Sequence, residues 1–231
     1  MARNQVQIFD STLRDGVQGQ GISFSLEDKL KIVKALDDIQ VDFIEAGNPG
    51  SNPKDMEFFK RLKDIELKHS KIAAFGSTRR PNIKVEEDKN IKDLLSSEAD
   101  VVVIFGKSWD FQVTDIIRTS LEENIQMIKD TIKYLCSKNK KVIFDAEHFY
   151  DGYKANRDYA IKTIKAAKES GADTAVLCDT NGGTLPHEIF EITKDVSEKV
   201  DINLGIHGHD DMGMAVANSI MAVKAGVKHV Q

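Results

Sequence analysis

Two histidines separated by one residue, His207 and His209, follow the apolar run Leu204–Ile206. Residues two apart in a β-strand point to the same face, so both imidazoles can reach one ion. Imidazole nitrogens, combined with a carboxylate oxygen, suit a divalent metal ion. The spacing therefore predicts a pair of metal ligands. Two solvated histidines in a loop are the alternative.

A carboxylate that could complete this ligand set follows the first apolar run of the chain. Asp15 lies in the polar segment Asp10–Gly16. The first and seventh strands of a closed eight-stranded barrel lie two apart, so polar groups at their ends converge. We predict that Asp15, His207 and His209 bind one divalent metal ion and leave positions open for a chelating substrate.

Two further charged residues follow strand-like runs and are candidate catalytic groups. Arg14 precedes Asp15, and a guanidinium beside a metal site can hold a developing oxyanion; a surface ion pair is the alternative. Its proposed work lies outside the core, so we expect its loss to lower turnover far more than stability. Glu147 is the candidate general base, with a buried salt bridge as the alternative. His148 faces the other way if its strand is regular.

Other residues near strand ends could contact a substrate. Thr180 and the following glycines could offer hydroxyl and backbone N–H groups to a substrate carboxylate, or could form only a turn. Glu45, near the end of the second apolar run, is another substrate-binding candidate. Four aromatic residues could close a pocket around a small substrate. They are Phe75, Phe105, Phe149 and Tyr150.

The elements that must position these residues repeat with a spacing of roughly 30 residues. Eight apolar runs recur, and segments with helical periodicity separate them. The runs are Val6–Phe9, Val41–Ala46, Ile72–Phe75, Val101–Phe105, Val142–Phe144, Ala175–Cys178, Leu204–Ile206 and Val227–Val230. This alternation predicts an α/β fold, a TIM (βα)8 barrel, whose catalytic groups lie at the carboxyl ends of the strands. A doubly wound open sheet is the structural alternative.

Local signals support the helices between these runs. Ser25 and Asp28 suit a capping box, and Pro186 suits a first helical turn. Gly171 and Gly226 lie where helices would end before the next strand. Two apolar stripes at helical spacing complete the pattern. They are Leu26, Leu30, Val33 and Leu36, and Leu121, Ile125, Ile128, Ile132 and Leu135.

The eighth run begins only a few residues before Gln231. We therefore expect residues 1–231 to form one catalytic barrel domain, truncated in the eighth βα unit. It would lack the end of strand 8, helix 8 and any C-terminal regulatory domain.

Composition excludes several classes of protein. The chain is 41% hydrophobic and 30% charged, with a formal net charge of −5 and no basic stripe, so we expect no nucleic-acid partner. Met1 to Asp10 lacks a signal-peptide pattern, and no window has the apolar length needed to span a bilayer. We therefore expect a soluble, cytoplasmic protein without a membrane partner. Cys136 and Cys178 have neither zinc nor redox spacing and are interpreted as buried packing residues.

Motifs at both ends of the chain resemble one enzyme family. Phe9–Gly16 and His207–Gly213 are similar, in the same order, to motifs of the metal-dependent barrel family of 2-isopropylmalate, homocitrate and citramalate synthases. Glu45–Pro53, Asp145–Gly152 and Cys178–Pro186 most resemble the citramalate synthase branch. The resemblance covers essentially the whole chain.

This resemblance implies a reaction and roles for individual residues. Asp15, His207 and His209 would bind a divalent metal ion (Mg²⁺, Mn²⁺ or Zn²⁺), Arg14 and Thr180 would hold the 2-oxo acid, and Glu147 would be the active-site glutamate. Acetyl-CoA, the co-substrate, would add to pyruvate in a Claisen-type condensation, followed by thioester hydrolysis. The metal would act as Lewis acid and template. A homodimer in isoleucine or leucine biosynthesis is expected.

Other functions remain open from the sequence. A 2-isopropylmalate synthase, a homocitrate synthase or a hydroxymethylglutaryl-CoA-type lyase would use the same barrel chemistry, and the pocket volume would decide the substrate. Family members have an asparagine ligand on the eighth strand and a Gly-rich loop near the acyl-CoA site, both beyond Gln231. The alternative of another class is therefore an inert metal-binding or assembly module that needs a further segment.

Overall fold

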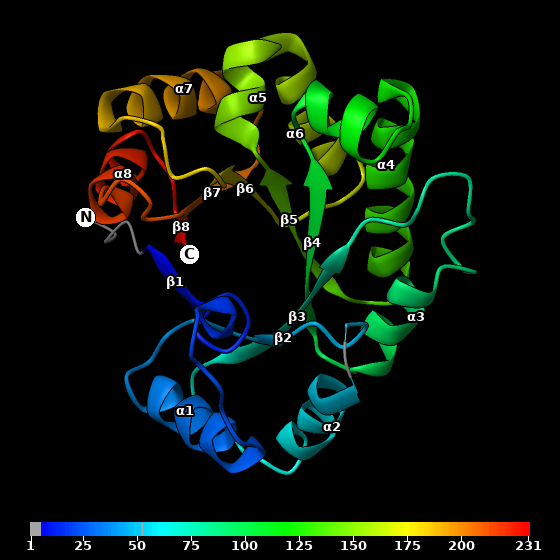
Figure 1. The fold of residues 1–231 in the computed structure, drawn as a ribbon, viewed down its shortest axis with the longest axis vertical. Helices are drawn as coiled ribbons and strands as arrows, with labels where there is room; N and C mark the ends of the chain where they lie inside the picture. Colours follow the sequence, from blue (N-terminus) through cyan, green and yellow to red (C-terminus); the bar gives the residue numbers. More distant parts are fainter. Residues whose placement is uncertain (1–5, 52) are drawn as a thin grey trace.

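Eight parallel strands close into a barrel in the order of the sequence (Figure 1). The computed structural model describes residues 6–51 and 53–231. The strands are β1 (Gln7–Asp10), β2 (Phe43–Gly47), β3 (Lys71–Ser77), β4 (Val101–Lys107), β5 (Lys141–Glu147), β6 (Thr174–Asp179), β7 (Asn203–Gly208) and β8 (His229–Val230). Closure is made by β8, where His229 pairs with Gln7 of β1 and with Gly205 of β7. The predicted TIM barrel is confirmed, and the open sheet is excluded.

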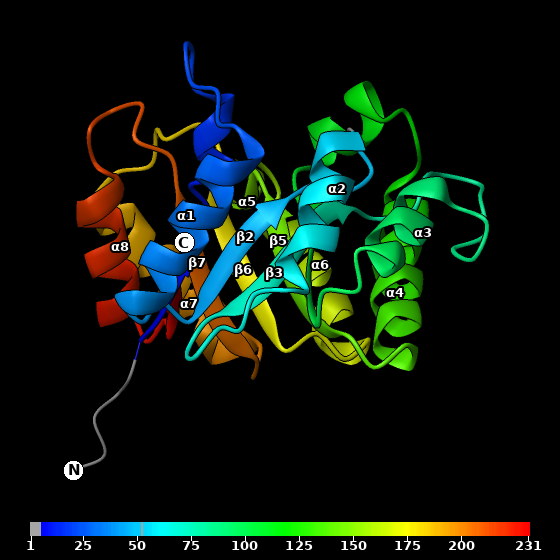
Figure 2. The ribbon, with the colours of Figure 1, turned by 90° about the horizontal axis from the view of Figure 1, so that it is seen from below.

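Helices cover the outside of the barrel between successive strands (Figure 2). They are α1 (Leu26–Asp38), α2 (Pro53–Leu62), α3 (Lys89–Ser96), α4 (Leu121–Ser137), α5 (Phe149–Ala155), α6 (Arg157–Glu169), α7 (Pro186–Lys199) and α8 (Ala215–Lys224). The connection from β5 to β6 holds two of them, α5 and α6. None of the helices in the described ranges is long and apolar enough to cross a membrane.

The predicted helix boundaries follow from their capping chemistry. The Ser25 hydroxyl accepts from the Asp28 N–H at 3.1 Å, and the Asp28 carboxylate accepts from the Ser25 N–H, which completes the capping box of α1. Pro186 lies in the first turn of α7. Gly171 and Gly226, after α6 and α8, adopt φ of 97° and 107°. Glycine adopts this left-handed backbone without the steric cost of a Cβ.

The barrel has one apolar core inside the sheet and another between the sheet and the helices. Alternate residues along each strand supply these two cores, because successive side chains point to opposite faces. Phe9, Phe43 and Cys178 belong to the inner core, and Phe144 belongs to the outer one. Cys178 is buried as predicted, but Cys136 is only half-buried. Cys136 lies in the last turn of α4, where its thiol contacts the Gly171 carbonyl at the rim.

Asp37 anchors the end of α1 to the segment before β3. Its carboxylate accepts the backbone N–H groups of Lys68, His69 and Ser70 at 2.8–2.9 Å. Burial raises the pKa of Asp37, but these hydrogen bonds outweigh burial and lower the pKa to about 2. Hydrogen bonds to the charged form favour ionisation in this way.

Candidate metal centre

Asp15, His207 and His209 converge at the carboxyl end of the barrel. Asp15 lies in the loop after β1, where its N–H donates to the Ser11 carbonyl at 2.9 Å. His207 lies within β7, and His209 follows that strand. Asp15 Oδ2 is 3.2 Å from His207 Nε2 and 3.4 Å from His209 Nε2. The three ligand atoms lie within 4.8 Å of one another.

The donor set fits a divalent metal ion. Two imidazole nitrogens and one carboxylate oxygen come from side chains that line the cavity. A catalytic metal site uses three such protein ligands and keeps further positions for water or substrate. This is the one group of three or more histidine, cysteine or acidic side chains with such spacing in residues 6–51 and 53–231.

Hydrogen bonds between the same three groups shift the pKa values of Asp15 and His207. Hydrogen bonds from His207 and His209 hold the pKa of Asp15 well below its usual range, and Arg14 contributes further. Burial lowers the pKa of His207, but the hydrogen bond to Asp15, the charge of Asp145 and the hydrogen bond to Gln231 together outweigh burial, and the net pKa is raised. A cation must displace the proton that His207 donates to Asp15, because only a deprotonated nitrogen can act as a ligand.

Arg14 links the ligand set to the interior of the sheet. Its Nε donates to Glu45 Oε2 at 2.6 Å, its Nη1 lies 3.2 Å from Asp15 Oδ1, and its guanidinium lies 3.9 Å above the centre of the Phe75 ring. Burial lowers the pKa of Arg14, but Glu45 and Asp15 outweigh burial and raise it. Arg14 is therefore a partly buried member of a charge network with two carboxylate partners, and it is not an exposed surface residue.

Glu45 lies behind Arg14 and away from the cavity. Its side chain is 0% exposed and also accepts from the Ser11 hydroxyl at 2.5 Å. The structure does not support the predicted contact of Glu45 with substrate, because its side chain is fully buried and does not line the cavity. Loss of Arg14 should therefore also lower stability, since Glu45 would become a buried unpaired charge; whether turnover falls far more than stability stays a prediction.

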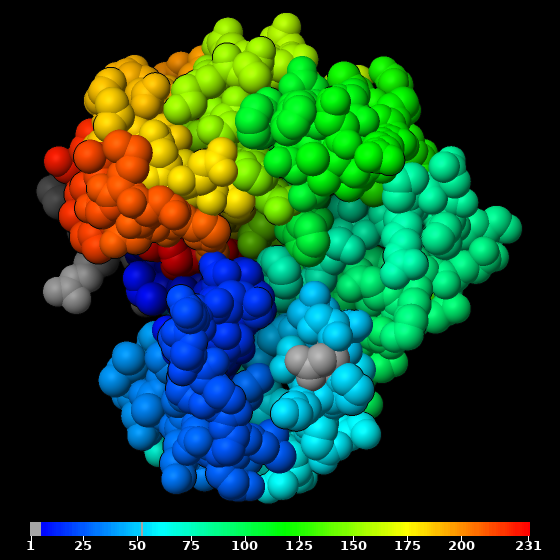
Figure 3. Space-filling view, in the orientation of Figure 1, coloured from blue at the N-terminus to red at the C-terminus, as the bar shows by residue number. Residues whose placement is uncertain are grey.

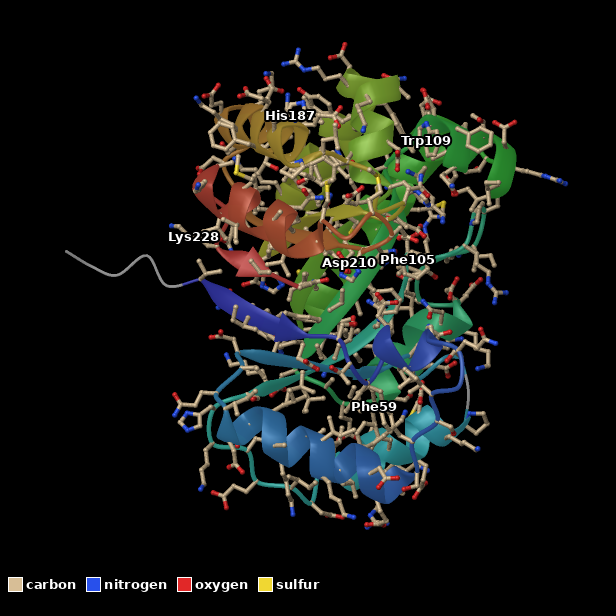
Figure 4. The ribbon with its side chains drawn as sticks, turned by 60° about the vertical axis from the view of Figure 1, so that its left-hand side comes forward. Phe59, Phe105, Trp109, His187, Asp210 and Lys228 are labelled. Atoms are coloured by element: carbon tan, nitrogen blue, oxygen red, sulfur yellow. The ribbon has the colours of Figure 1, made fainter. Side chains whose placement is uncertain are left out.

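A cavity of about 270 Å³ opens beside the three ligands. Its lining residues are Arg14, Asp15, Phe75, Phe105, Asp145, Glu147, Cys178, Thr180, His207 and His209. The Phe75 and Phe105 rings stack with centroids 5.1 Å apart and form one wall. In Figure 4, Phe105 and Asp210 are labelled toward the middle of the view, and His187 is labelled on the outer helix α7.

Phe149 and Tyr150 do not contribute to this wall, and their predicted role is wrong. The chain leaves β5 at Glu147 and turns sharply at His148, which has φ of 55°. The two aromatic residues then begin α5 and are completely buried. The Tyr150 hydroxyl contacts Thr193 Oγ1 of α7 at 2.8 Å. The turn at His148 therefore directs both rings toward the helices.

Glu147 and Thr180 both reach the cavity from neighbouring strand ends. Glu147 forms an ion pair with Lys107 at the end of β4. Thr180 Oγ1 accepts from the His148 N–H at 2.9 Å, which leaves its hydroxyl hydrogen free to donate elsewhere. The His148 ring faces Trp109, with centroids 5.8 Å apart, and is absent from the cavity lining.

Two polar residues of the site had no part in the sequence prediction. Asp145 lines the cavity and is 3% exposed; burial raises its pKa to about 7, against the opposing effect of His207. Its position two residues before Glu147 on one strand could have identified it. The Gln231 side chain contacts His207 Nδ1 at 2.9 Å. Nothing in the spacing of residues along the sequence could have identified Gln231 as part of the site.

Two other hollows adjoin the site. One, of about 800 Å³, lies between the loops after β1 and β2, and it shares Arg14 and Phe75 with the smaller cavity. The other is lined by Asp15, Gly16, His209, Asp210 and Asp211. In Figure 3 the blue segment after β1 and the orange segment after β7 meet on this face.

The chain is similar to known proteins over essentially its whole length. The HMGL-like family model matches residues 5–231. The (R)-citramalate synthase of Aquifex aeolicus is 57% identical over 227 residues, which are 98% of this chain and 43% of that protein. The corresponding protein of Sulfolobus acidocaldarius is 53% identical over 231 residues, which are 100% of this chain and 44% of that protein. A probable 2-isopropylmalate synthase of Methanopyrus kandleri is 34% identical over 98% of this chain and 43% of that protein.

The chain spans less than half of the length of these curated relatives. Among solved structures, the hydroxymethylglutaryl-CoA lyase of Pseudomonas aeruginosa is 20% identical, with a TM-score of 0.79 over 98% of this chain and 75% of that chain. The Bacillus subtilis HMG-CoA lyase is 19% identical, with a TM-score of 0.77 over 98% of this chain and 76% of that chain. At these identities the likeness shows the fold alone.

Proposed function

Because the chain belongs to the HMGL-like family, we propose that the site at the mouth of its barrel condenses acetyl-CoA with pyruvate to give citramalate. The observation that carries the proposal is the convergence of Asp15, His207 and His209 beside Arg14 and Glu147 on one small cavity. Identity favours citramalate synthases, at 48–57%, over probable 2-isopropylmalate synthases, at 33–34%.

Asp15, His207 and His209 would hold the divalent cation, Mg²⁺, Mn²⁺ or Zn²⁺. When bound, it supplies Lewis acidity and a template for the carboxylate and ketone oxygens of a 2-oxo acid. The Thr180 hydroxyl donates to the substrate carboxylate, because its oxygen already accepts from the His148 N–H. The Arg14 guanidinium stabilises the negative charge that develops on the former ketone oxygen.

Glu147 acts as the general base. It removes a methyl proton from acetyl-CoA, and the resulting carbon nucleophile attacks the ketone carbon of pyruvate. The new C–C bond forms as the π bond of the ketone breaks, and the former ketone oxygen takes up a proton to become a hydroxyl. Water then cleaves the thioester and releases CoA. The Lys107 ion pair fixes the Glu147 carboxylate at the cavity wall. The adjoining hollow of about 800 Å³ gives the larger co-substrate a route to the same point.

The volume of the cavity supports a small 2-oxo acid. About 270 Å³ lies at the lower end of ligand sites, and the stacked Phe75 and Phe105 rings occupy the wall. Pyruvate has only a methyl group to place there, whereas 2-oxoisovalerate has a branched side chain. The aromatic pair therefore favours pyruvate.

We propose also that residues 1–231 belong to the catalytic barrel domain of a cytoplasmic homodimer in isoleucine biosynthesis. Both substrates are metabolites of the cell interior. The exposed side chains of Val216 and Ile220 on α8 support self-association, because exposed apolar surface favours burial against another chain.

The proposal is tested by incubating the purified chain with acetyl-CoA and each 2-oxo acid in turn, with Mg²⁺, Mn²⁺ or Zn²⁺. Free thiol and citramalate, detected by mass spectrometry, are expected with pyruvate, and Glu147→Gln should lower the rate by about 10²–10⁴-fold. Preference for 2-oxoisovalerate would instead identify a 2-isopropylmalate synthase. Cleavage of a hydroxymethylglutaryl thioester would identify a lyase. Cation binding without turnover would favour the inert metal-binding module.

A further inference from the structure

The Gln231 side chain contacts three buried polar groups beneath the proposed cation site. Its Oε1 lies 2.9 Å from His207 Nδ1. Its Nε2 lies 3.3 Å from Asp145 Oδ1 and 3.3 Å from His229 Nε2. Gln231 therefore connects the proposed ligand on β7 to a carboxyl group on β5 and to a histidine on β8.

The hydrogen-bonding capacity of each group fixes the direction of these contacts. The amide nitrogen of Gln231 can only donate, so Asp145 Oδ1, which faces it, accepts. His229 is 0% exposed, and burial lowers its pKa to about 4, so its ring is neutral. Its Nε2 faces the same amide nitrogen and therefore accepts the second amide hydrogen. The amide oxygen of Gln231 must then face His207, and His207 Nδ1 must carry a hydrogen.

The orientation of the His207 ring follows from this hydrogen bond. With Nδ1 donating to Gln231, the lone pair that a cation needs can be freed only at Nε2. That atom is the one that lies 3.2 Å from Asp15. Histidine ligands are commonly oriented by a hydrogen bond from the other ring nitrogen, which also raises their basicity.

We propose that Gln231 is a positioning residue: its amide oxygen holds His207 with Nδ1 protonated and Nε2 directed into the cation site, and Asp145 holds that amide in place. This inference rests on the proposed cation site, and it assigns to Asp145 and Gln231 a role that does not require contact with substrate.

The test measures Zn²⁺ affinity by competition with a chromophoric chelator. Gln231→Leu keeps a side chain of similar size but removes both polar atoms, and the dissociation constant should rise by about 10–100-fold. In the double variant Gln231→Glu with Asp145→Asn, the new glutamate accepts from His207 Nδ1, and the new asparagine donates to that glutamate. This pair should bring the affinity back to within about threefold of the original chain.

Asn203→Leu is the matched control. It removes a hydrogen bond of 2.9 Å to Thr174 Oγ1 at the other end of β7, and it should leave the Zn²⁺ affinity unchanged. Long-range ¹H–¹⁵N spectra of the Zn²⁺-loaded chain provide a second readout, in which the His207 proton should reside on Nδ1.

The possible failures can be told apart. A chain that binds no Zn²⁺ would overturn the proposed cation site and this inference with it. Zn²⁺ binding that is equally tight in Gln231→Leu, or coordination of His207 through Nδ1, would overturn the role of Gln231 alone. Loss of affinity in Gln231→Leu without rescue by the paired substitution would overturn the proposed orientation of His207 through this hydrogen bond.

Discussion

Arg14 Nε donates a hydrogen bond of 2.6 Å to Glu45 Oε2, and this contact joins the loop after β1 to the interior of β2. Glu45 has no exposed side-chain surface. The guanidinium that faces the cavity therefore also neutralises a buried carboxylate, so the chemistry of the site and the stability of the barrel share one residue.

The first prediction concerns the stability of this pair. Arg14→Ala should lower the free energy of unfolding by about 3–5 kcal/mol, because it leaves Glu45 as an uncompensated buried charge. Arg14→Met combined with Glu45→Met should cost much less, since no charge remains. Urea unfolding curves measure both. Equal losses in the two variants would show that the pair does not neutralise a buried charge.

The second prediction separates the catalytic role of Arg14 from its structural one. Arg14→Lys keeps a positive charge near Glu45 but loses the planar donor fork. We expect turnover to fall by about a hundredfold or more, the scale for one lost oxyanion donor. Steady-state rates should be compared at matched folded fractions. Normal turnover in Arg14→Lys would assign the residue to stability alone.

The third prediction concerns the cation ligands. His207→Ala and Asp15→Asn should weaken Zn²⁺ binding by more than the about 10–100-fold that loss of an outer hydrogen-bond partner costs. His187→Ala, on the outer surface of α7, should have no effect and serves as the control (Figure 4). Isothermal titration measures the affinities. Unchanged binding in both site variants would place the cation elsewhere.

The fourth prediction concerns substrate size. Phe105→Ala should widen the cavity wall without removing Phe75, the ring on which Arg14 lies. Each methylene that the pocket admits is worth about 1–3 kcal/mol, so kcat/KM for 2-oxoisovalerate relative to pyruvate should rise by about 10–200-fold. Competition between the two acids in one reaction measures this ratio. A ratio that does not change would show that another wall sets the substrate size.

The fifth prediction concerns pH. The pKa of Asp37 is about 2 in the folded protein and 3.8 as its ordinary value, so its hydrogen bonds stabilise the fold above about pH 4 and lose their effect as the pH falls toward 2. Asp37→Asn should cost at most about 2 kcal/mol at pH 7 and almost nothing at pH 2. Exposed Asp38→Asn is the control. Urea unfolding across this range would contradict the assignment if the two variants behaved alike.

The barrel itself could be predicted because its signals are local and repeated. Each strand carries an apolar run, and helix ends such as Ser25 and Gly171 carry capping residues that act within a few positions. The convergence of Asp15 with the two histidines could also be anticipated, since strand ends meet at one edge of a closed barrel.

The residues that support the site from within the barrel could not be predicted, because their contacts depend on how far each side chain is buried and on the direction in which it points. Glu45 and Phe149 both lie near strand ends, yet one points behind Arg14 and the other lies beyond the turn at His148. The alternation of side-chain directions along β5 ends at His148, because this residue has a left-handed backbone. Gln231 acts through three long-range contacts, and no local pattern encodes such contacts.

Closure of the sheet by two residues of β8 has a consequence for how the protein forms. The barrel closes when Gln7 of β1 pairs with His229 of β8. During synthesis β1 leaves the ribosome before β8 exists, so this pairing can form only late. Asp15 follows that first strand and His207 lies on the strand beside β8, so the cation site should be among the last parts to assemble. Pulse-labelling hydrogen exchange should show protection of β4 and β5 amides before those of β1, because pairing between distant segments is slow.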